Sequence, residues 1–177
     1  MKPPPERLQP LSISLQVVAR RPWVPAPAAV RRWARSAHGT GVASLGPRAR
    51  KSLTGGPAHL GVRIVGLAAS RRLDRDYRGK DRPTNVLSFP ASREERSEDG
   101  ALGDLVICAP VVAAEARGQG KALAAHWAHM VIHGTLHLLG YDHVSPRHAR
   151  IMERLEVEIL RGFGYPDPYR LAIGSTA

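Results

Sequence analysis

Alternating and continuous runs of hydrophobic residues predict four short strands. Residues 11–18 alternate between apolar and polar side chains, the pattern of a strand with one buried face. Apolar runs at 60–65, 85–89 and 102–108 are short and bounded by polar or glycine-containing segments, as buried strands are. The last run places Cys108 in the interior, where a thiol is more often an inert core residue than a nucleophile.

Helical spacing of apolar residues and typical end residues predict five helices. They cover residues 28–36, 66–76, 110–118, 121–139 and 146–161. Proline at the start of a helix and glycine just after its end are the residues that these positions favour. The longest of the five carries four of the eight histidines of the chain.

The order of these elements predicts an α+β fold, a small mixed β-sheet of about four strands packed with about five or six helices. We expect a single domain over residues 11–170, with a flexible proline-rich tail at 1–10 and a second tail at 171–177. Within the domain, residues 39–59 are predicted to be a loop or an insertion, and residues 92–100 a polar loop.

Composition limits the class of protein. The chain has 177 residues and 43% hydrophobic residues, enough to bury a core without covalent staples. Its single cysteine excludes an intramolecular disulfide and a four-thiolate zinc site. No run of 18 apolar residues is present, and the apolar stretch 11–19 lacks a cleavage signature after it. We therefore expect a cytoplasmic protein with no membrane partner.

Charge divides the chain into two parts. Residues 1–72 hold 13 Lys and Arg against one acidic residue, whereas residues 73–177 hold 13 against 14. The basic part favours a polyanionic partner such as nucleic acid. However, 22 of the 26 basic residues are arginine, which a GC-rich genome also produces by codon bias. Both interpretations stay open at this point.

The specific chemical signal is a spacing of three histidines in the neutral part. His133 and His137 are four residues apart, so they project from one face of a helix, one turn apart. Gly140 can reverse the chain in a left-handed conformation and bring His143 beside them. Three imidazoles leave the fourth position of a tetrahedral zinc ion open, which is typical of a catalytic site. The spacing therefore predicts one bound Zn²⁺.

Further histidines leave alternatives open. His126 and His129 share an arc of about 80° with His133 and His137 on a helix, so either could line the same cleft. His129 could also support a ligand from behind or simply pack. The competing interpretation of the whole group is a histidine-rich helix whose rings are hydrogen-bonded in the core. His148 is the weakest candidate.

The histidine spacing is that of the metzincin zinc proteases, with one departure. Their signature, H-E-x-x-H-x-x-G-x-x-H, has a glutamate as general base after the first histidine. Gly134 stands at that position here. We therefore expect a metzincin-like zinc helix for which peptidase activity is disfavoured.

Several sequence blocks resemble one family. Residues 133–143 read HGTLHLLGYDH, and residues 77–90 read YRGKDRPTNVLSFP. Together with LGDLVI at 102–107 and GYPDPY at 164–169, they resemble the YbeY family of bacterial rRNA maturation endoribonucleases. The resemblance is close over residues 60–169.

This resemblance implies a function and a set of site residues. Family members are single-domain α+β metalloproteins that bind zinc through the residues matching His133, His137 and His143. Their functionally important arginine matches Arg78, which completes the implied catalytic set. They cleave single-stranded RNA and mature the 3′ end of small-subunit (16S) rRNA, with a role in ribosome quality control. The implied partners are the rRNA precursor and the small ribosomal subunit or one of its proteins, with no DNA.

The sequence leaves two interpretations open for several residues in and near these blocks. Arg78 lies in a charged turn before a buried strand, where its planar guanidinium could pair with a phosphate or remain solvated. Lys80 and Arg82 are auxiliary phosphate contacts or have no role. Asp142 either accepts a hydrogen bond from a ligand imidazole or caps the turn after the helix, and Tyr141 is expected to pack.

Three functions follow, in decreasing order of support. The first is a zinc-dependent endoribonuclease of rRNA maturation. The second is a metal-stabilised ribosome assembly factor that acts by binding pre-rRNA, which the missing glutamate keeps open. The third is a metallopeptidase, which Gly134 disfavours.

Overall fold

The computed structural model describes residues 10–19, 23–53 and 57–170. The predicted tails, residues 1–9 and 171–177, lie outside these described residues.

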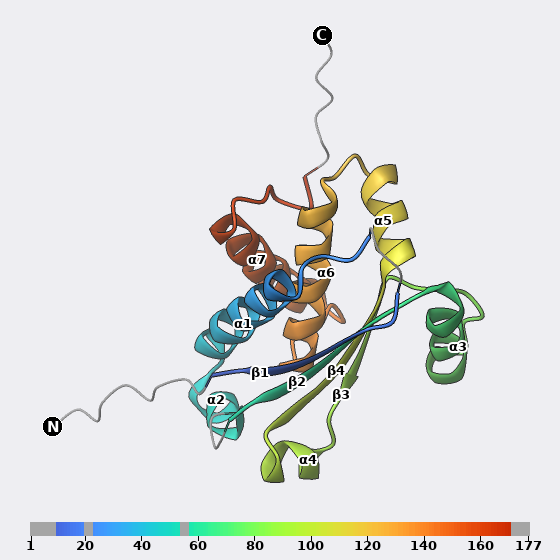
Figure 1. The fold of residues 1–177 in the computed structure, drawn as a ribbon. Coiled ribbons are helices and arrows are strands. Elements are labelled where there is room, and N and C mark those ends of the chain that lie inside the picture. The colour runs from blue at the N-terminus through green and yellow to red at the C-terminus, as the bar shows by residue number, and fades with distance from the viewer. Residues whose placement is uncertain (1–9, 20–22, 54–56, 171–177) are drawn as a thin grey trace, which may run out of the picture.

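A four-stranded sheet forms the centre of the fold (Figure 1). Its strands are β1 (Ser12–Val17), β2 (His59–Val65), β3 (Val86–Pro90) and β4 (Ala101–Cys108). They lie in the order β1-β2-β4-β3; β1, β2 and β4 are parallel, and β3 runs antiparallel to β4. All four predicted strands and the mixed sheet are confirmed.

Seven helices surround this sheet within the described residues. They are α1 (Pro27–Ser44), α2 (Pro47–Leu53), α3 (Leu67–Arg78), α4 (Arg93–Glu98), α5 (Ala109–Gly118), α6 (Leu123–Leu138) and α7 (Pro146–Gly162). The α+β class is confirmed, but the helix count is seven rather than five or six. Within the described ranges, no helix is long and apolar enough to cross a membrane.

The two predicted loops were wrong because local and tertiary contacts form helices there. Most of residues 39–53 belongs to the end of α1 and to α2. Burial of Gly41 against α6 outweighs the low helix propensity of glycine in this part of α1. In α4, Ser92 and Glu95 form a reciprocal capping box, and Arg96 donates a hydrogen bond to the Leu138 carbonyl oxygen.

The sheet positions α6 at the centre of the main core. Helices α1, α6 and α7 gather on one face of the sheet, where Trp33, Ile107 and Leu136 are among the fully buried side chains (Figure 1). Helix α3 covers the other face, where its Leu73 packs against a small cluster containing Val106. Helix α6 is therefore held by contacts along most of its length.

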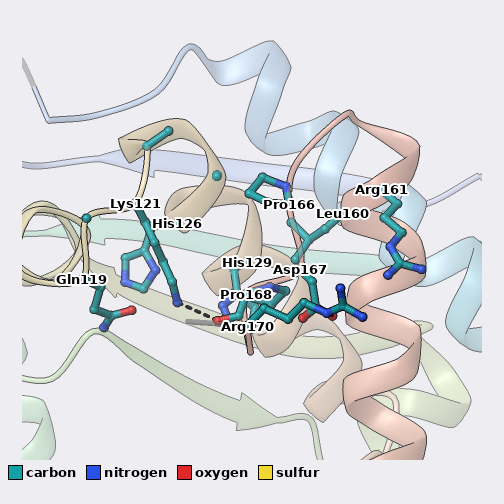
Figure 2. Close-up of a pocket in the computed structure, with 13 residues that line it drawn as sticks. Gln119, Lys121, His126, His129, Leu160, Arg161, Pro166, Asp167, Pro168 and Arg170 are labelled. Carbon is teal, nitrogen blue, oxygen red and sulfur yellow. Dashed lines mark hydrogen bonds and ion pairs between the residues drawn. The ribbon is translucent and has the colours of Figure 1, made fainter. Parts of the chain in front are cut away.

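After α7 the chain returns to the start of α6 (Figure 2). The Lys121 ammonium group donates a hydrogen bond of 2.8 Å to the Pro168 carbonyl oxygen. This contact places the segment 166–170 beside the first turns of the histidine-bearing helix.

Candidate metal centre

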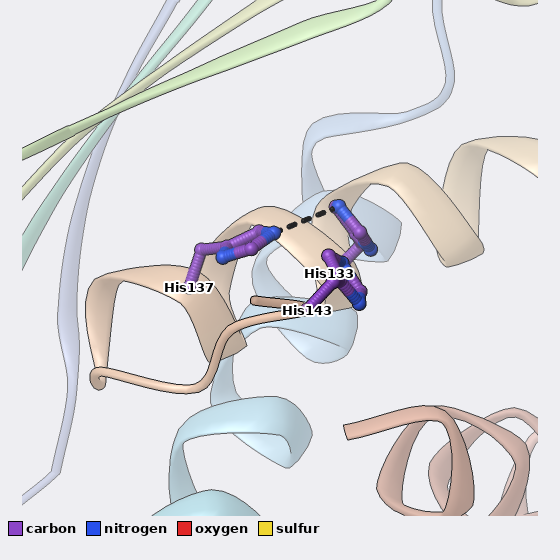
Figure 3. A group of neighbouring side chains, drawn as sticks. All are labelled: His133, His137 and His143. Atoms are coloured by element: carbon purple, nitrogen blue, oxygen red, sulfur yellow. Dashed lines mark hydrogen bonds between the residues drawn. The ribbon is translucent and has the colours of Figure 1, made fainter. Parts of the chain in front are cut away.

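Three histidine side chains converge at the end of α6 (Figure 3). His133 and His137 project from the last turns of the helix, and His143 follows the turn beyond it. The ring centroids lie 4.6 Å apart for His133 and His137, 5.0 Å for His133 and His143, and 4.9 Å for His137 and His143. The structure thus brings together all three histidines that the spacing selected.

The turn after α6 brings His143 to the cluster. Gly140 has a φ of +96°, in the left-handed region that a side chain disfavours. The Tyr141 backbone N–H donates to the Leu136 carbonyl oxygen at 3.1 Å, and the Tyr141 hydroxyl donates to the Gly41 carbonyl oxygen of α1 at 2.8 Å. The reversal is therefore fixed both locally and against a distant helix.

Asp142 stabilises this turn. Its carboxylate accepts a hydrogen bond from the Val144 backbone N–H at 3.0 Å and lies 3.2 Å from His148 Nδ1. These contacts support the capping interpretation of Asp142. Tyr141 packs against the core as expected.

A buried carboxylate orients one of the three rings. Glu156 of α7 is 0% exposed, and its Oε1 lies 2.6 Å from His133 Nδ1. Burial acts to raise the pKa of Glu156, but hydrogen bonds from His129 and His133 outweigh it and lower the pKa to about 2. An ionised carboxylate only accepts, so His133 carries its proton on Nδ1 and leaves Nε2 free for a metal ion.

The geometry of the three histidines fits a metal ion. The Nε2 atoms of His133 and His137 are 3.1 Å apart, and one nitrogen from each of the three rings lies within 4.8 Å of the others. A tetrahedral zinc ion holds two imidazole nitrogens about 3.3 Å apart. These residues could therefore hold a metal ion with little rearrangement.

The low pKa of His137 also favours metal binding. Burial, and then the nearby His133 and His143, lower the pKa of His137 from 6.5 to about 4, although a backbone hydrogen bond with Tyr141 acts in the opposite direction. The ring is therefore neutral at neutral pH, which is the form that binds a metal ion.

A second cluster beside the first is a hydrogen-bond network. His129, His133 and Glu156 also have their ligand atoms within 4.8 Å of one another. However, the 2.6 Å contact between His133 and Glu156 is shorter than the spacing of about 3.3 Å that a shared tetrahedral ion requires. Tyr169 completes the network by donating its hydroxyl to Glu156. The group supports the three-histidine cluster from behind.

Arg78 lies at the same cleft as the histidine cluster. A cleft of about 490 Å³ is lined by Arg78, residues 84–88, Pro90 and the three histidines. Arg78 ends α3, and its guanidinium lies 3.4 Å from the buried carboxylate of Asp74. Its side chain remains 46% exposed, so its remaining donors can reach a ligand in the cleft. Lys80 and Arg82 are exposed and do not line this cleft.

The other candidate histidines occupy different environments. His126 is buried, and its Nε2 lies 2.8 Å from Glu115. His129 is buried beside Glu156 and Tyr169, with its Nε2 3.6 Å from the Glu156 carboxylate. His148 contacts Asp142 at the surface.

Comparison with known proteins gives the family. The family model described as "Endoribonuclease YbeY" matches residues 44–164. A protein named Endoribonuclease YbeY from Alkalilimnicola ehrlichii is 53% identical over 157 residues, which cover 88% of each chain. The chain belongs to the YbeY family.

A solved structure has the same fold as this YbeY-family chain. The solution structure of TM1509 from Thermotoga maritima matches with a TM-score of 0.52 at 22% identity. The match covers 89% of this chain and 99% of that one. At this identity, the likeness shows the fold alone.

In this YbeY-family chain, Gly134 packs closely against the sheet. A Cβ atom at Gly134 would lie 2.7 Å from Leu105 Cδ2 and 3.3 Å from Val86 Cγ2 of the sheet. Helix α6 therefore contacts the sheet directly at the position where metzincins have their glutamate. A side chain at position 134 would therefore start against Leu105 and Val86 of the sheet.

Sequence reasoning missed two members of the site, Glu156 and Tyr169. A signal for Glu156 was present, since it lies among the apolar positions Met152, Leu155 and Ile159 of α7. A carboxylate on the buried face of an amphipathic helix requires a partner. Tyr169 reaches the network only through the return of the chain after α7, for which the sequence offers no signal.

Proposed function

We propose that this chain is a zinc-dependent endoribonuclease that cleaves single-stranded RNA and matures the 3′ end of small-subunit (16S) rRNA, with a role in ribosome quality control. The observation that carries the proposal is one cleft lined by both Arg78 and the three convergent histidines. The description of the matching family and the name of the 53% identical relative support an RNA substrate.

His133, His137 and His143 are the proposed ligands of one zinc ion. When bound, zinc would supply Lewis-acid chemistry and would lower the pKa of water. Glu156 retains the proton at His133 Nδ1, so the ring keeps its Nε2 lone pair toward the ion. The low pKa of His137 keeps that ring neutral and available.

Arg78 is the proposed phosphate-binding residue. Cleavage of a phosphodiester concentrates negative charge on the non-bridging oxygens of the phosphate. The planar guanidinium group of an arginine can donate hydrogen bonds to two of these oxygens. Asp74 is buried and lies 3.4 Å from the guanidinium, which anchors Arg78 at the end of α3. In this position, Arg78 binds and orients the scissile phosphate beside the histidines.

The remaining parts of the proposal concern partner and compartment. We propose that the substrate is presented on the small ribosomal subunit or one of its proteins, in the cytoplasm. Cys108 is a buried free thiol, which is typical of a reducing compartment. We also retain the prediction that residues 11–170 form one domain.

The test uses purified, zinc-loaded protein and a short single-stranded RNA spanning the 3′ end of small-subunit rRNA. Arg78→Glu and His137→Ala are expected to lose cleavage by at least about a hundredfold, the usual effect of removing transition-state charge stabilisation. Arg147→Glu makes the same charge reversal on the exposed surface of α7 and is expected to retain activity. Equal cleavage by wild type, Arg78→Glu and His137→Ala would contradict the proposal.

The absence of a carboxylate at position 134 favours one second candidate. A metal-stabilised assembly factor would bind pre-rRNA and act by occupancy, so it would need no general base. A folded His137→Ala protein that still supports 3′-end maturation in cells would favour this candidate over the nuclease.

A further inference from the structure

A second hollow lies at the opposite end of α6 from the metal cluster. It has a volume of about 420 Å³, within the range of small-molecule sites. Its walls come from residues 119–122, the first turns of α6, the end of α7 and the segment 166–170 (Figure 2). We call it the α6 hollow. Among the described residues, it shares no lining residue with the cleft of Arg78.

Two buried histidines in the wall have nitrogens without a partner. His126 is 3% exposed and His129 is 8% exposed, and both line the α6 hollow. Among the described residues, neither Nδ1 atom has a hydrogen-bond partner. Leaving a buried polar group unsatisfied costs about 1–3 kcal/mol. Both Nδ1 atoms are covered by neighbouring atoms, so the two rings contribute to the wall of the hollow through their other atoms.

The entrance of the hollow carries an excess of positive charge. Lys121, Arg161 and Arg170 line it, against one carboxylate, Asp167. That carboxylate lies 3.6 Å from Arg170 and accepts a hydrogen bond from the Tyr169 backbone N–H. The net positive charge of these lining residues favours an anionic ligand.

The start of α6 adds to this preference. Its N-cap residue is Ala122, which offers no side-chain hydrogen bond to the first turn. The backbone N–H groups of an uncapped first turn, together with the helix dipole, attract phosphate and carboxylate groups. His126 lies in the next turn and also lines the hollow, so the helix start is part of the same wall.

The other walls are apolar and suit a ligand larger than a bare phosphate. They are formed by Ala122, Ala125, Leu160, Pro166 and Pro168. His126 precedes His133 by seven residues, which corresponds to about 10 Å along the helix axis. A strand that enters the metal cleft can therefore reach the hollow within a few nucleotides.

We propose that the α6 hollow binds a phosphate-bearing nucleotide unit, with the phosphate near Lys121, Arg161 and the start of α6. The unit belongs either to the RNA strand in the metal cleft or to a free mononucleotide. The assignment of this unit to the RNA strand rests on the proposed function. The proposal that the hollow binds a nucleotide does not.

Glu115 holds His126 in place behind the hollow. Burial acts to raise the pKa of Glu115, but hydrogen bonds from His126 and Asn85 outweigh it and lower the pKa. The ionised carboxylate accepts from His126 Nε2–H, and this contact fixes the position of the ring in the wall of the hollow.

The test compares two double variants that remove the same charge. Arg161→Ser with Arg170→Ser changes the α6 hollow, whereas Arg93→Ser with Arg147→Ser removes two exposed arginines elsewhere. Calorimetric titration of the zinc-loaded proteins with adenosine 5′-monophosphate is expected to show about tenfold weaker binding for the hollow variant only. Adenosine, which lacks the phosphate, is expected to bind wild type about tenfold more weakly than the monophosphate.

A second titration identifies the source of the nucleotide. Labelled single-stranded RNA is titrated into both double variants on a His143→Ala background, which prevents cleavage. Weaker RNA binding by the hollow variant supports the RNA strand as the source. Loss of monophosphate binding with unchanged RNA binding supports a free nucleotide.

Equal affinities of the two double variants for both the monophosphate and RNA would overturn the proposal, as would no binding of either by wild type. RNA cleavage by wild type separates this failure from failure of the proposed function. If cleavage persists while the double variants bind alike, only the hollow proposal fails. If cleavage is absent while the hollow variant alone loses the monophosphate, only the nuclease proposal fails.

Discussion

The two ends of α6 carry the same residue type in two different environments. Near its start, His126 and His129 are buried, and each lies against a carboxylate. Near its end, His133 and His137 are half-buried and meet His143 at one point. The number of histidines on a helix therefore does not identify a metal site. A candidate metal site is identified instead by imidazole nitrogens that converge on one point. Here that convergence depends on the chain reversal at Gly140.

The largest expected effect tests this difference directly. His133→Ala is expected to abolish both stoichiometric zinc binding and RNA cleavage, because it leaves two ligands. His126→Ala is expected to retain zinc but to lose about 1–3 kcal/mol of unfolding free energy, because Glu115 loses its buried partner. Metal analysis by mass spectrometry and urea unfolding measure the two effects. Equal zinc loss in both variants would show that the two ends of α6 form one site.

A smaller effect is expected from the carboxylate behind the cluster. Glu156→Gln is expected to weaken zinc binding about 10–100-fold, because the His133 ring loses its orienting acceptor. Competition with a chelating dye measures the affinity without relying on activity. Glu158→Gln, on the exposed side of the same helix, is the matched control. Unchanged affinity in Glu156→Gln would mean that packing alone orients the ring.

The close approach of α6 to the sheet predicts a stability effect of about 1–3 kcal/mol. Gly134→Ala would place a Cβ atom 2.7 Å from Leu105 Cδ2, so the Leu105 side chain, the helix or the strand must move. Gly118→Ala in α5 meets no neighbouring atom and is expected to be neutral or slightly stabilising. Thermal unfolding of both variants measures the contrast. A Gly134→Ala protein as stable as wild type would indicate that α6 shifts at little cost.

The smallest expected effect is a change in pH dependence. The pKa of His137 is about 4 in the folded chain, against 6.5 for an ordinary histidine. Between these values the unfolded state binds more protons, so His137 makes the metal-free protein lose stability as the pH falls from 6.5 to 4. His137→Gln is expected to show a shallower decline in urea unfolding across this window. Parallel curves for the two proteins would show that His137 does not contribute.

The sequence was sufficient to find the histidine cluster because its information is local. His133, His137 and His143 lie within one helix end and one turn, so residue spacing and a glycine define their geometry. Arg78 was found through family resemblance rather than through physical reasoning. Glu156 and Tyr169 depend on how α7 and the following segment pack against α6, which spacing along the chain does not encode.

The fold, too, was predicted where the signal is local and missed where it depends on tertiary contacts. All four strands were predicted within about two residues because apolar runs directly reflect burial in a sheet. The end of α1, at Gly39 and Gly41, was predicted to be a loop because glycine disfavours helices in isolation. Tertiary contacts with α6 reversed that preference. The capping box of Ser92 and Glu95 was a local signal for α4 that was overlooked.

The hydrogen bond from Tyr141 to Gly41 joins residues 100 positions apart in the chain. Glu156 similarly reaches His133 from another helix. Contacts of such long range form late in folding, because a large loop must close first. The metal-binding geometry therefore matures only with the cooperative folding of the chain. The proposed zinc ion, by selecting this geometry, would add its binding energy to the stability of the whole fold, and tight zinc binding would then report that folding is complete.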